Sequence, residues 1–349
     1  MVKIGRLISL MLSATGLSSQ VIASELNIYL WEDTISPRVV EAWNKSHDTQ
    51  LNFYHFDNDD ERSLFMLSSD QIPFDVVILD NVSAQLFSQQ DKFEDLSSFD
   101  ANQNNARMWQ QACGSHSVPY FWGYVGIVYR KSKISQPPTQ WRDLVDIDEK
   151  MKGHVGLLED SVETLLPALY SLNLSPLTAS VEDLKKAYEK LEAATPDILT
   201  YEYSLSYVRS HSNNNDLYMA VSYSGDQFSL NRYFDNDDWD FVLPEGKPYI
   251  WVDCLALNSS SHNKQQAKLF LEFLMQPEIA AMNAQDIKAA TPNLKALHLM
   301  PASYINNKAI LLTDDLLAQS IIDSQLSSSN LSQRAKIINS LIKQHEAKP

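Results

Sequence analysis

Two stretches of the chain place an indole beside carboxylates, a combination that suits an organic cation. Trp31 is followed by Glu32 and Asp33, and Trp251 is followed two positions later by Asp253. An aromatic face packs against methylene groups and attracts an ammonium by about 0.5–2 kcal/mol once water is excluded. A carboxylate about 4 Å from an ammonium contributes on the order of 4 kcal/mol at an effective dielectric constant of about 20, before the cost of desolvation. Both stretches therefore favour a ligand that alternates methylene and ammonium groups, as a linear polyamine does.

Acids and aromatic residues also stand at the ends of other predicted strands. Asp80 follows the apolar run 74–79, and Asp160 and Glu163 follow the predicted strand 156–158. Each acid alone is typical of a helix N-cap or a solvated first turn, but their repetition at successive strand ends favours a site for a multivalent cation. The candidate ligand-binding residues from these strand ends are Trp31, Glu32, Asp33, Asp80, Asp160, Glu163, Tyr223, Trp251 and Asp253.

The elements that carry these residues follow an alternating βα pattern. Residues 26–30 alternate apolar with other side chains, as a strand with one buried face does, and Ser36 with Pro37 begins a helix. The run 74–79 is almost continuously apolar, as in a strand covered on both faces. Short connections between such elements predict a parallel, doubly wound sheet, in which ligands bind beyond the carboxyl ends of the strands.

A second βα series begins near residue 156, which predicts two sheets rather than one. No long linker rich in Gly, Ser or Pro separates the two series. The long apolar strands at 123–130 and 250–257 are candidates for chain crossings between them. This organisation favours two lobes, with helices on both faces of each sheet and the ligand in the cleft between the lobes.

The N-terminal segment has the pattern of a secretory signal peptide over residues 1–23. Lys3 and Arg6 precede an apolar run, and small residues mark a cleavage site near Ala23. The formal charge of the whole chain is −16, and removing Lys3 and Arg6 takes it to −18. Such a chain repels nucleic acid and anionic lipid and attracts cations. We expect an exported protein, which in a double-membraned bacterium lies in the periplasm.

Neither catalysis nor metal binding finds support in the residue pattern. The sequence contains no nucleophile elbow, phosphate-binding loop or zinc-protease motif. Paired acids could serve a glycoside hydrolase, but nothing assigns one as the acid and another as the base. We therefore expect no catalytic residues, no metal and no cofactor. The two cysteines, Cys113 and Cys254, could form a disulfide in an exported protein, although the sequence does not show that they meet.

Several short motifs together resemble the polyamine-binding periplasmic proteins over nearly all of the predicted mature chain. The motifs are residues 29–33 with Pro37 and Glu41, 74–77, 117–123, 141–144, Asp160 with Glu163, 249–256 and 291–293. The resemblance implies a type II periplasmic binding protein with two lobes around the ligand. It places lobe 1 at residues 24–125 and 253–305, and lobe 2 at residues 126–252 and 306–349.

The resemblance also assigns individual residues to the ligand. Those that match ligand-holding positions of the family are Trp31, Asp33, Asp160, Glu163, Trp251 and Asp253, with Gln325 added on a looser alignment. Other positions depart from the family: Tyr223 replaces a tryptophan, Asp80 replaces a serine, and Thr34, Val82 and Ala289 replace tyrosines. The site thus gains an acid and loses several aromatic rings, which leaves the choice of polyamine open.

One branch of this family senses norspermidine instead of importing polyamines, and the diverged site resembles that branch more closely. The resemblance implies a receptor for norspermidine or spermidine that signals to an inner-membrane cyclic-di-GMP enzyme controlling biofilm formation. The alternative is the substrate-binding component of a spermidine/putrescine ABC importer, whose partner would be an ABC permease. A third possibility from the residues is a binder of another solute, such as an amino-acid-derived cation or an iron complex. The acids and tryptophans allow the cation, whereas the absence of paired tyrosines disfavours the iron complex.

Overall fold

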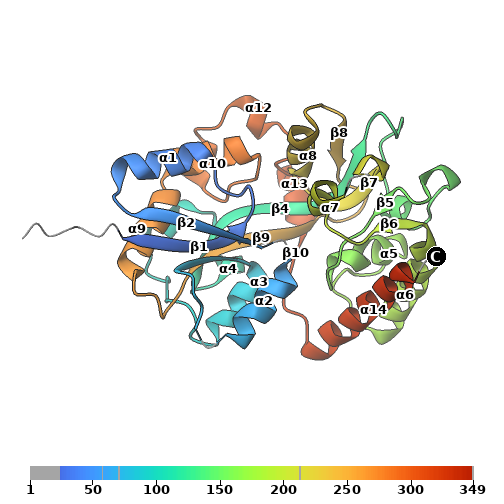
Figure 1. The fold of residues 1–349 in the computed structure, drawn as a ribbon, viewed down its shortest axis with the longest axis horizontal. Coiled ribbons are helices and arrows are strands. Elements are labelled where there is room, and N and C mark those ends of the chain that lie inside the picture. Colours follow the sequence, from blue (N-terminus) through green and yellow to red (C-terminus); the bar gives the residue numbers. More distant parts are fainter. Residues whose placement is uncertain (1–23, 57, 70, 212–213, 348–349) are drawn as a thin grey trace, which may run out of the picture.

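The computed structural model describes residues 24–56, 58–69, 71–211 and 214–347 (Figure 1). The predicted signal peptide, residues 1–23, lies outside the described residues. The elements form two groups on either side of a central crossing of strands (Figure 1). Within the described ranges no helix is both long and apolar enough to cross a membrane.

Ten strands form one connected sheet path. Its order is β2 (Gln50–Phe56), β1 (Glu25–Trp31), β3 (Val76–Asp80), β9 (Tyr249–Leu257), β4 (Ser117–Arg130), β7 (Met219–Tyr223), β5 (Val155–Gly156) and β6 (Ile198–Thr200), with β10 (Ile321–Ile322) paired to β9 and β8 (Trp239–Val242) paired to β4. β1 runs parallel to β2 and β3, whereas β9 runs antiparallel to β3 and β4. β3 and β9 thus bring two strand segments far apart in sequence to adjacent positions.

The strand β4 joins the two halves of the sheet. Its first part, from Ser117 to Tyr124, pairs with β9, and its second part, from Val125 onward, pairs with β7. The sequence predicts two sheets, and the structure connects them into one path because this single 14-residue strand contributes to both. Gly123 stands at the changeover, where a side chain would collide with the Trp251 indole.

Helices cover both halves of the sheet. Around β1, β2, β3 and β9 lie α1 (Pro37–Ser46), α2 (Asp59–Ser68), α3 (Asn81–Ser88), α4 (Arg107–Cys113), α9 (Lys264–Leu274) and α10 (Pro277–Ile287) (Figure 1). Around β5, β6 and β7 lie α5 (Leu166–Ser171), α6 (Val181–Ala194) and the C-terminal helix α14 (Ser328–Glu346) (Figure 1). The remaining helices are α7 (Ser204–Ser210), α8 (Asp226–Phe234), α11 (Leu294–Leu297), α12 (Ala302–Ile305) and α13 (Asp314–Gln319).

The core is divided between two apolar clusters. One contains Trp43 and Phe270 and fills the half built on β1, β3 and β9, while the other contains Leu184 and Leu341 and fills the half built on β5 and β6. Both α6 and α14 begin at a serine N-cap, and each turns an apolar stripe toward the second cluster. The predicted α/β fold with helices on both faces of the sheet is confirmed.

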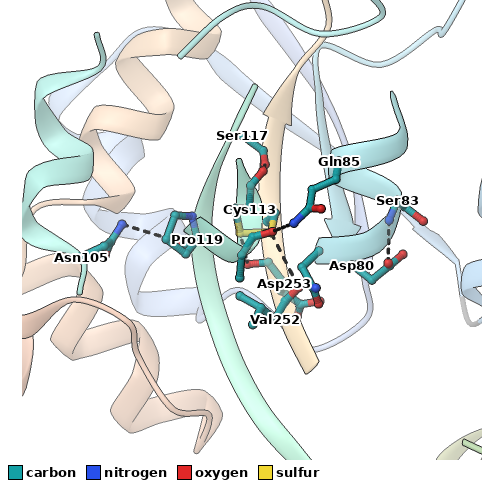
Figure 2. The surroundings of a disulfide bond; sticks show 12 residues. Asp80, Ser83, Gln85, Asn105, Cys113, Ser117, Pro119, Val252 and Asp253 are labelled. Atoms are coloured by element: carbon teal, nitrogen blue, oxygen red, sulfur yellow. Dashed lines mark hydrogen bonds between the residues drawn. A yellow bond between two sulfur atoms is a disulfide. The ribbon is translucent and has the colours of Figure 1, made fainter. Parts of the chain in front are cut away.

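A disulfide ties helix α4 to strand β9. Cys113, the last residue of α4, is bonded to Cys254, with Cα atoms 5.6 Å apart (Figure 2). The Gln85 side chain donates to the Ala112 carbonyl at 2.7 Å and so holds α3 against α4. Because Cys254 follows Asp253 directly, the crosslink anchors the strand next to a candidate ligand-binding residue.

Candidate ligand-binding site

Asp80 and Asp253 lie opposite each other on neighbouring strands. They are direct partners in the antiparallel pairing of β3 with β9, which places their side chains on the same face of the sheet (Figure 2). Asp80 also caps α3, where its Oδ1 accepts the Ser83 N–H at 2.8 Å. Asp253 is only 7% exposed. Burial raises the pKa of Asp253 well above its ordinary value, the negative charges of Asp59 and Asp80 raise it further, and Arg62 opposes the shift.

Asp160 and Glu163 are positioned together by a tight turn. The Asp160 Oδ1 accepts the N–H of Val162 at 2.6 Å and that of Glu163 at 2.8 Å, while its own N–H donates to the Thr164 hydroxyl at 3.0 Å. This turn begins a short 3-10 helix that buries Glu163 to 9% exposure. Burial raises the pKa of Glu163 well above its ordinary value, and the charges of Asp160 and Asp323 raise it further.

Asp323 joins these acids from the far end of the chain. It follows β10, and its Oδ1 accepts the Tyr249 hydroxyl at 2.5 Å, while its backbone carbonyl accepts the Asn81 amide at 2.8 Å. Burial raises the pKa of Asp323 to about 7, with further contributions from the charges of Asp80 and Asp160. Asp323 therefore links Asp80 and Asp253 to Asp160 and Glu163. We call these five residues the acid cluster.

Aromatic rings border this acid cluster. Trp31, the last residue of β1, lies 4.6 Å from Phe56, measured between ring centroids. Tyr223, the last residue of β7, meets Trp251 edge to face at 6.0 Å. Burial raises the pKa of Tyr223 well above its ordinary value, followed by the charges of Glu163 and Asp160, so this ring stands beside the two acids. Rings and carboxylates together form surroundings suited to a cation with an apolar backbone.

Glu32 and Asp33 are engaged elsewhere. Both side chains are exposed, at 59% and 49%, and both pair with Arg209 of α7, at 2.6 Å and 2.8 Å respectively. Asp33 has a φ of 61°, a left-handed conformation that turns the chain immediately after β1. The ion pairs connect the end of β1 to α7. The structure thus brings these two acids to an arginine of the chain itself.

The two sheet halves and the acid cluster belong to a chain that is similar to known proteins over most of its length. Residues 38–311 match the bacterial extracellular solute-binding proteins. The chain belongs to this family. In the part of this solute-binding protein that the structure describes, no group of three or more His, Cys, Asp or Glu side chains is arranged to hold a metal ion.

Individual relatives narrow the comparison within the solute-binding proteins. The chain is 60% identical to the norspermidine sensor of Vibrio cholerae serotype O1 over 346 residues, which covers 99% of this chain and 96% of the relative. It is 24% identical to the putrescine-binding periplasmic protein SpuD of Pseudomonas aeruginosa, covering 87% and 88% of the two chains. The solved structure of the spermidine/putrescine ABC transporter substrate-binding protein PotD of Streptococcus pneumoniae shares the fold, with a TM-score of 0.76, 22% identity, and coverage of 93% and 100%.

The candidate residues predicted from the sequence of this solute-binding protein fall into four groups in the structure. Six of them adjoin one another through the acid cluster and its rings: Asp80, Asp160, Glu163, Tyr223, Trp251 and Asp253. Trp31 reaches the cluster through Phe56 and Arg62. Glu32 and Asp33 pair with Arg209. Gln325 is exposed, two positions after Asp323.

Sequence reasoning about this solute-binding protein missed three charged residues of the site. Asp323 follows a two-residue strand, too short to leave an alternating pattern in the sequence. Asp59 and Arg62 lie on α2, whose acidic start is typical of any helix N-terminus. Arg62 was detectable in principle, because a lone arginine on the inner face of a helix requires a buried partner.

Proposed function

We propose that this protein is a periplasmic receptor for a linear polyamine of the norspermidine or spermidine class. The observation that carries the proposal is the convergence of Asp80, Asp253, Asp160, Glu163 and Asp323, bordered by aromatic rings, from four segments of the chain. Several of these carboxyls have raised pKa values because they are buried beside one another. A multivalent cation would relieve that repulsion, whereas a neutral solute would not.

The relatives support the same ligand class. The one at 60% identity is named a norspermidine sensor, and those at 24% and 22% are named for putrescine and for spermidine with putrescine. In our proposal the segment 1–23 exports the protein to the periplasm. The mature chain then closes on the polyamine between lobe 1, residues 24–125 and 253–305, and lobe 2, residues 126–252 and 306–349. With this division, Trp31, Asp80 and Asp253 approach the ligand from one lobe, and Asp160, Glu163 and Asp323 from the other.

Binding is then read out by a membrane partner. A ligand shifts the balance between open and closed lobes only as far as its affinities for the two states differ. The acids of both lobes would contact one polyamine only when the lobes are closed, so the closed form is the one that the ligand favours. We propose that this form signals to an inner-membrane cyclic-di-GMP enzyme that controls biofilm formation. The high identity to a protein named as a sensor supports this partner over an ABC permease.

Calorimetry on the exported protein tests the ligand. Norspermidine and spermidine are each titrated into the protein, with putrescine as the shorter diamine for comparison. We expect the two triamines to bind more tightly than putrescine, because they bring one more ammonium to the acid cluster. Absence of both heat and thermal shift with all of these amines would refute the proposed function.

A genetic experiment tests the partner. Deleting the gene of the receptor should remove the response of biofilm mass to added norspermidine while leaving uptake of radiolabelled polyamine unchanged. The opposite result, a loss of uptake with an intact biofilm response, would identify the protein as the binding component of a polyamine ABC importer instead.

A further inference from the structure

A cation that belongs to the chain already lies within the acid cluster. Arg62, on α2, has a fully buried side chain, at 0% exposure. Its guanidinium forms ion pairs with Asp59 and with Asp80, the latter at 2.6 Å. It also donates to the Ser83 hydroxyl at 3.2 Å, and its central carbon lies 5.0 Å from the centre of the Phe56 ring. The guanidinium is therefore paired with two acids and set over an aromatic ring.

These surroundings are those that an ammonium group of the ligand would require. Asp80, which accepts from Arg62, stands directly opposite Asp253 in the pairing of β3 with β9. The positive charge of Arg62 favours the ionised form of Asp253 and so lowers the pKa of that carboxyl against the effect of burial. Phe56, beneath the guanidinium, contacts Trp31, the indole assigned to the ligand from the sequence. The chain thus supplies its own cation on this side of the cluster.

A free ammonium would compete poorly for this position. Arg62 is tethered to α2 and therefore acts at a high effective concentration beside its two acids. Displacing it would also leave a buried guanidinium without partners, which is strongly unfavourable. Its Nε atom has no hydrogen-bond partner among the residues that the structure describes, so the ion pairs with Asp59 and Asp80 carry most of its stabilisation. We expect Arg62 to stay in place when ligand binds.

The other side of the cluster lacks such an ion pair. Asp160 accepts from the backbone N–H groups of its own turn, and Asp323 accepts from a tyrosine hydroxyl. Within the described ranges, none of Asp160, Glu163 and Asp323 forms an ion pair with Arg or Lys. The buried Arg334 acts on their charges only from a distance, because its guanidinium donates to the Asn330 side chain and to the backbone carbonyls of Pro176 and Thr178. These acids, with Tyr223 and Trp251 beside them, remain for the ammonium groups of a ligand.

We propose that Arg62 is a specificity-determining residue that occupies one cation position of the site and so restricts the ligand to short polyamines. Diamines and triamines find enough acids in Asp160, Glu163 and Asp323 together with Asp253, which forms no ion pair with Arg62. A linear tetraamine must place its additional ammonium next to the guanidinium of Arg62, where a like charge repels it. This inference rests on the proposed function, since it concerns the same site and the same class of ligand.

Paired titrations of the exported protein test the role of Arg62. The affinities for norspermidine, a triamine, and spermine, a tetraamine, are measured by calorimetry for the wild type and for Arg62→Ala. We expect the ratio of spermine to norspermidine affinity to rise at least tenfold in Arg62→Ala, because one carboxylate position becomes free for the extra ammonium. Arg62→Lys keeps the charge and should leave the ratio within about threefold of the wild type.

Arg130 provides a matched control. It is also buried, pairs with Asp238 at 2.9 Å, and lies 5.6 Å from the Phe234 ring centroid, but on the outer end of β4. Arg130→Ala should lower the melting temperature without changing the ratio of the two affinities. If Arg62→Ala does not fold by circular dichroism, Arg62→Gln, whose amide can still donate to Asp80, is measured in the same way.

The outcomes separate this inference from the proposed function. If the wild type binds neither norspermidine nor spermine, the proposed function fails. If the wild type binds norspermidine but Arg62→Ala and Arg62→Gln leave the ratio unchanged, only the role of Arg62 is overturned. An equal loss of both affinities in a folded Arg62 variant also overturns it, since Arg62 would then act by positioning the acids.

Discussion

Replacing Asp253 by asparagine tests the acid cluster most directly. The substitution keeps the shape of the side chain and removes its charge at a position that is 7% exposed. Losing one partner of a buried charge pair costs about 2–5 kcal/mol of binding free energy. Part of that is offset here, because burial raises the pKa of Asp253 and so disfavours the charged form that pairs with the ligand. We therefore expect the lower half of the range, about 2–3 kcal/mol, or about a 30- to 150-fold rise in Kd.

The same substitution should leave the unliganded fold intact. A carboxyl whose pKa is raised in the folded state is destabilised in its ionised form, so stability falls as pH rises from the unfolded pKa toward the folded one. Asparagine carries no charge to bury. The melting temperature of unliganded Asp253→Asn at pH 7 should therefore equal or exceed that of the wild type.

Calorimetry and thermal unfolding on the same samples measure both quantities. Asp237→Asn is the matched control, because it removes one negative charge from an exposed turn between α8 and β8. Long-range attraction alone would weaken norspermidine binding about equally in the two variants. A Kd for Asp253→Asn within threefold of that for Asp237→Asn would refute the placement of Asp253 at the ligand.

Three further predictions concern other parts of the site. The pKa of Asp323 is raised to about 7 from an ordinary value of about 3.9, so below pH 7 the folded protein holds a proton that the cation must expel. Polyamine affinity should therefore rise from pH 5.5 to pH 8, with proton release detected by calorimetry in buffers of different ionisation enthalpy. An affinity that does not change with pH would contradict this prediction. Removing the disulfide with Cys113→Ser and Cys254→Ser should lower the free energy of unfolding in urea by about 2–5 kcal/mol, and an unchanged midpoint would show that the crosslink is dispensable. Asp33→Asn should weaken norspermidine binding less than about fivefold, because its exposed pair with Arg209 is worth about 0–1 kcal/mol; a loss above thirtyfold would mean that Asp33 leaves Arg209 for the ligand.

Much of the fold follows from local pattern in the sequence. The apolar alternation before Trp31 and the continuous apolar run before Asp80 identify β1 and β3, because burial on one or both faces imposes those patterns. Residues 181–194 carry apolar side chains three and four positions apart, as an amphipathic helix does, and α6 spans Val181–Ala194. The position of acids and rings at strand ends is also readable, since a strand end and its residue type are both local properties.

Which of those residues meet was decided only by the tertiary structure. The disulfide joins cysteines 141 positions apart, and Asp323 reaches Glu163 from a strand too short to predict. Arg62 enters the cluster, and Arg209 engages Glu32 and Asp33, through pairings that no local pattern encodes. The sequence determined what kinds of groups stand at the ends of the elements. The order of the strands and the packing of the helices determined which charges face one another, because the energy of a charge depends on neighbours that are distant along the chain.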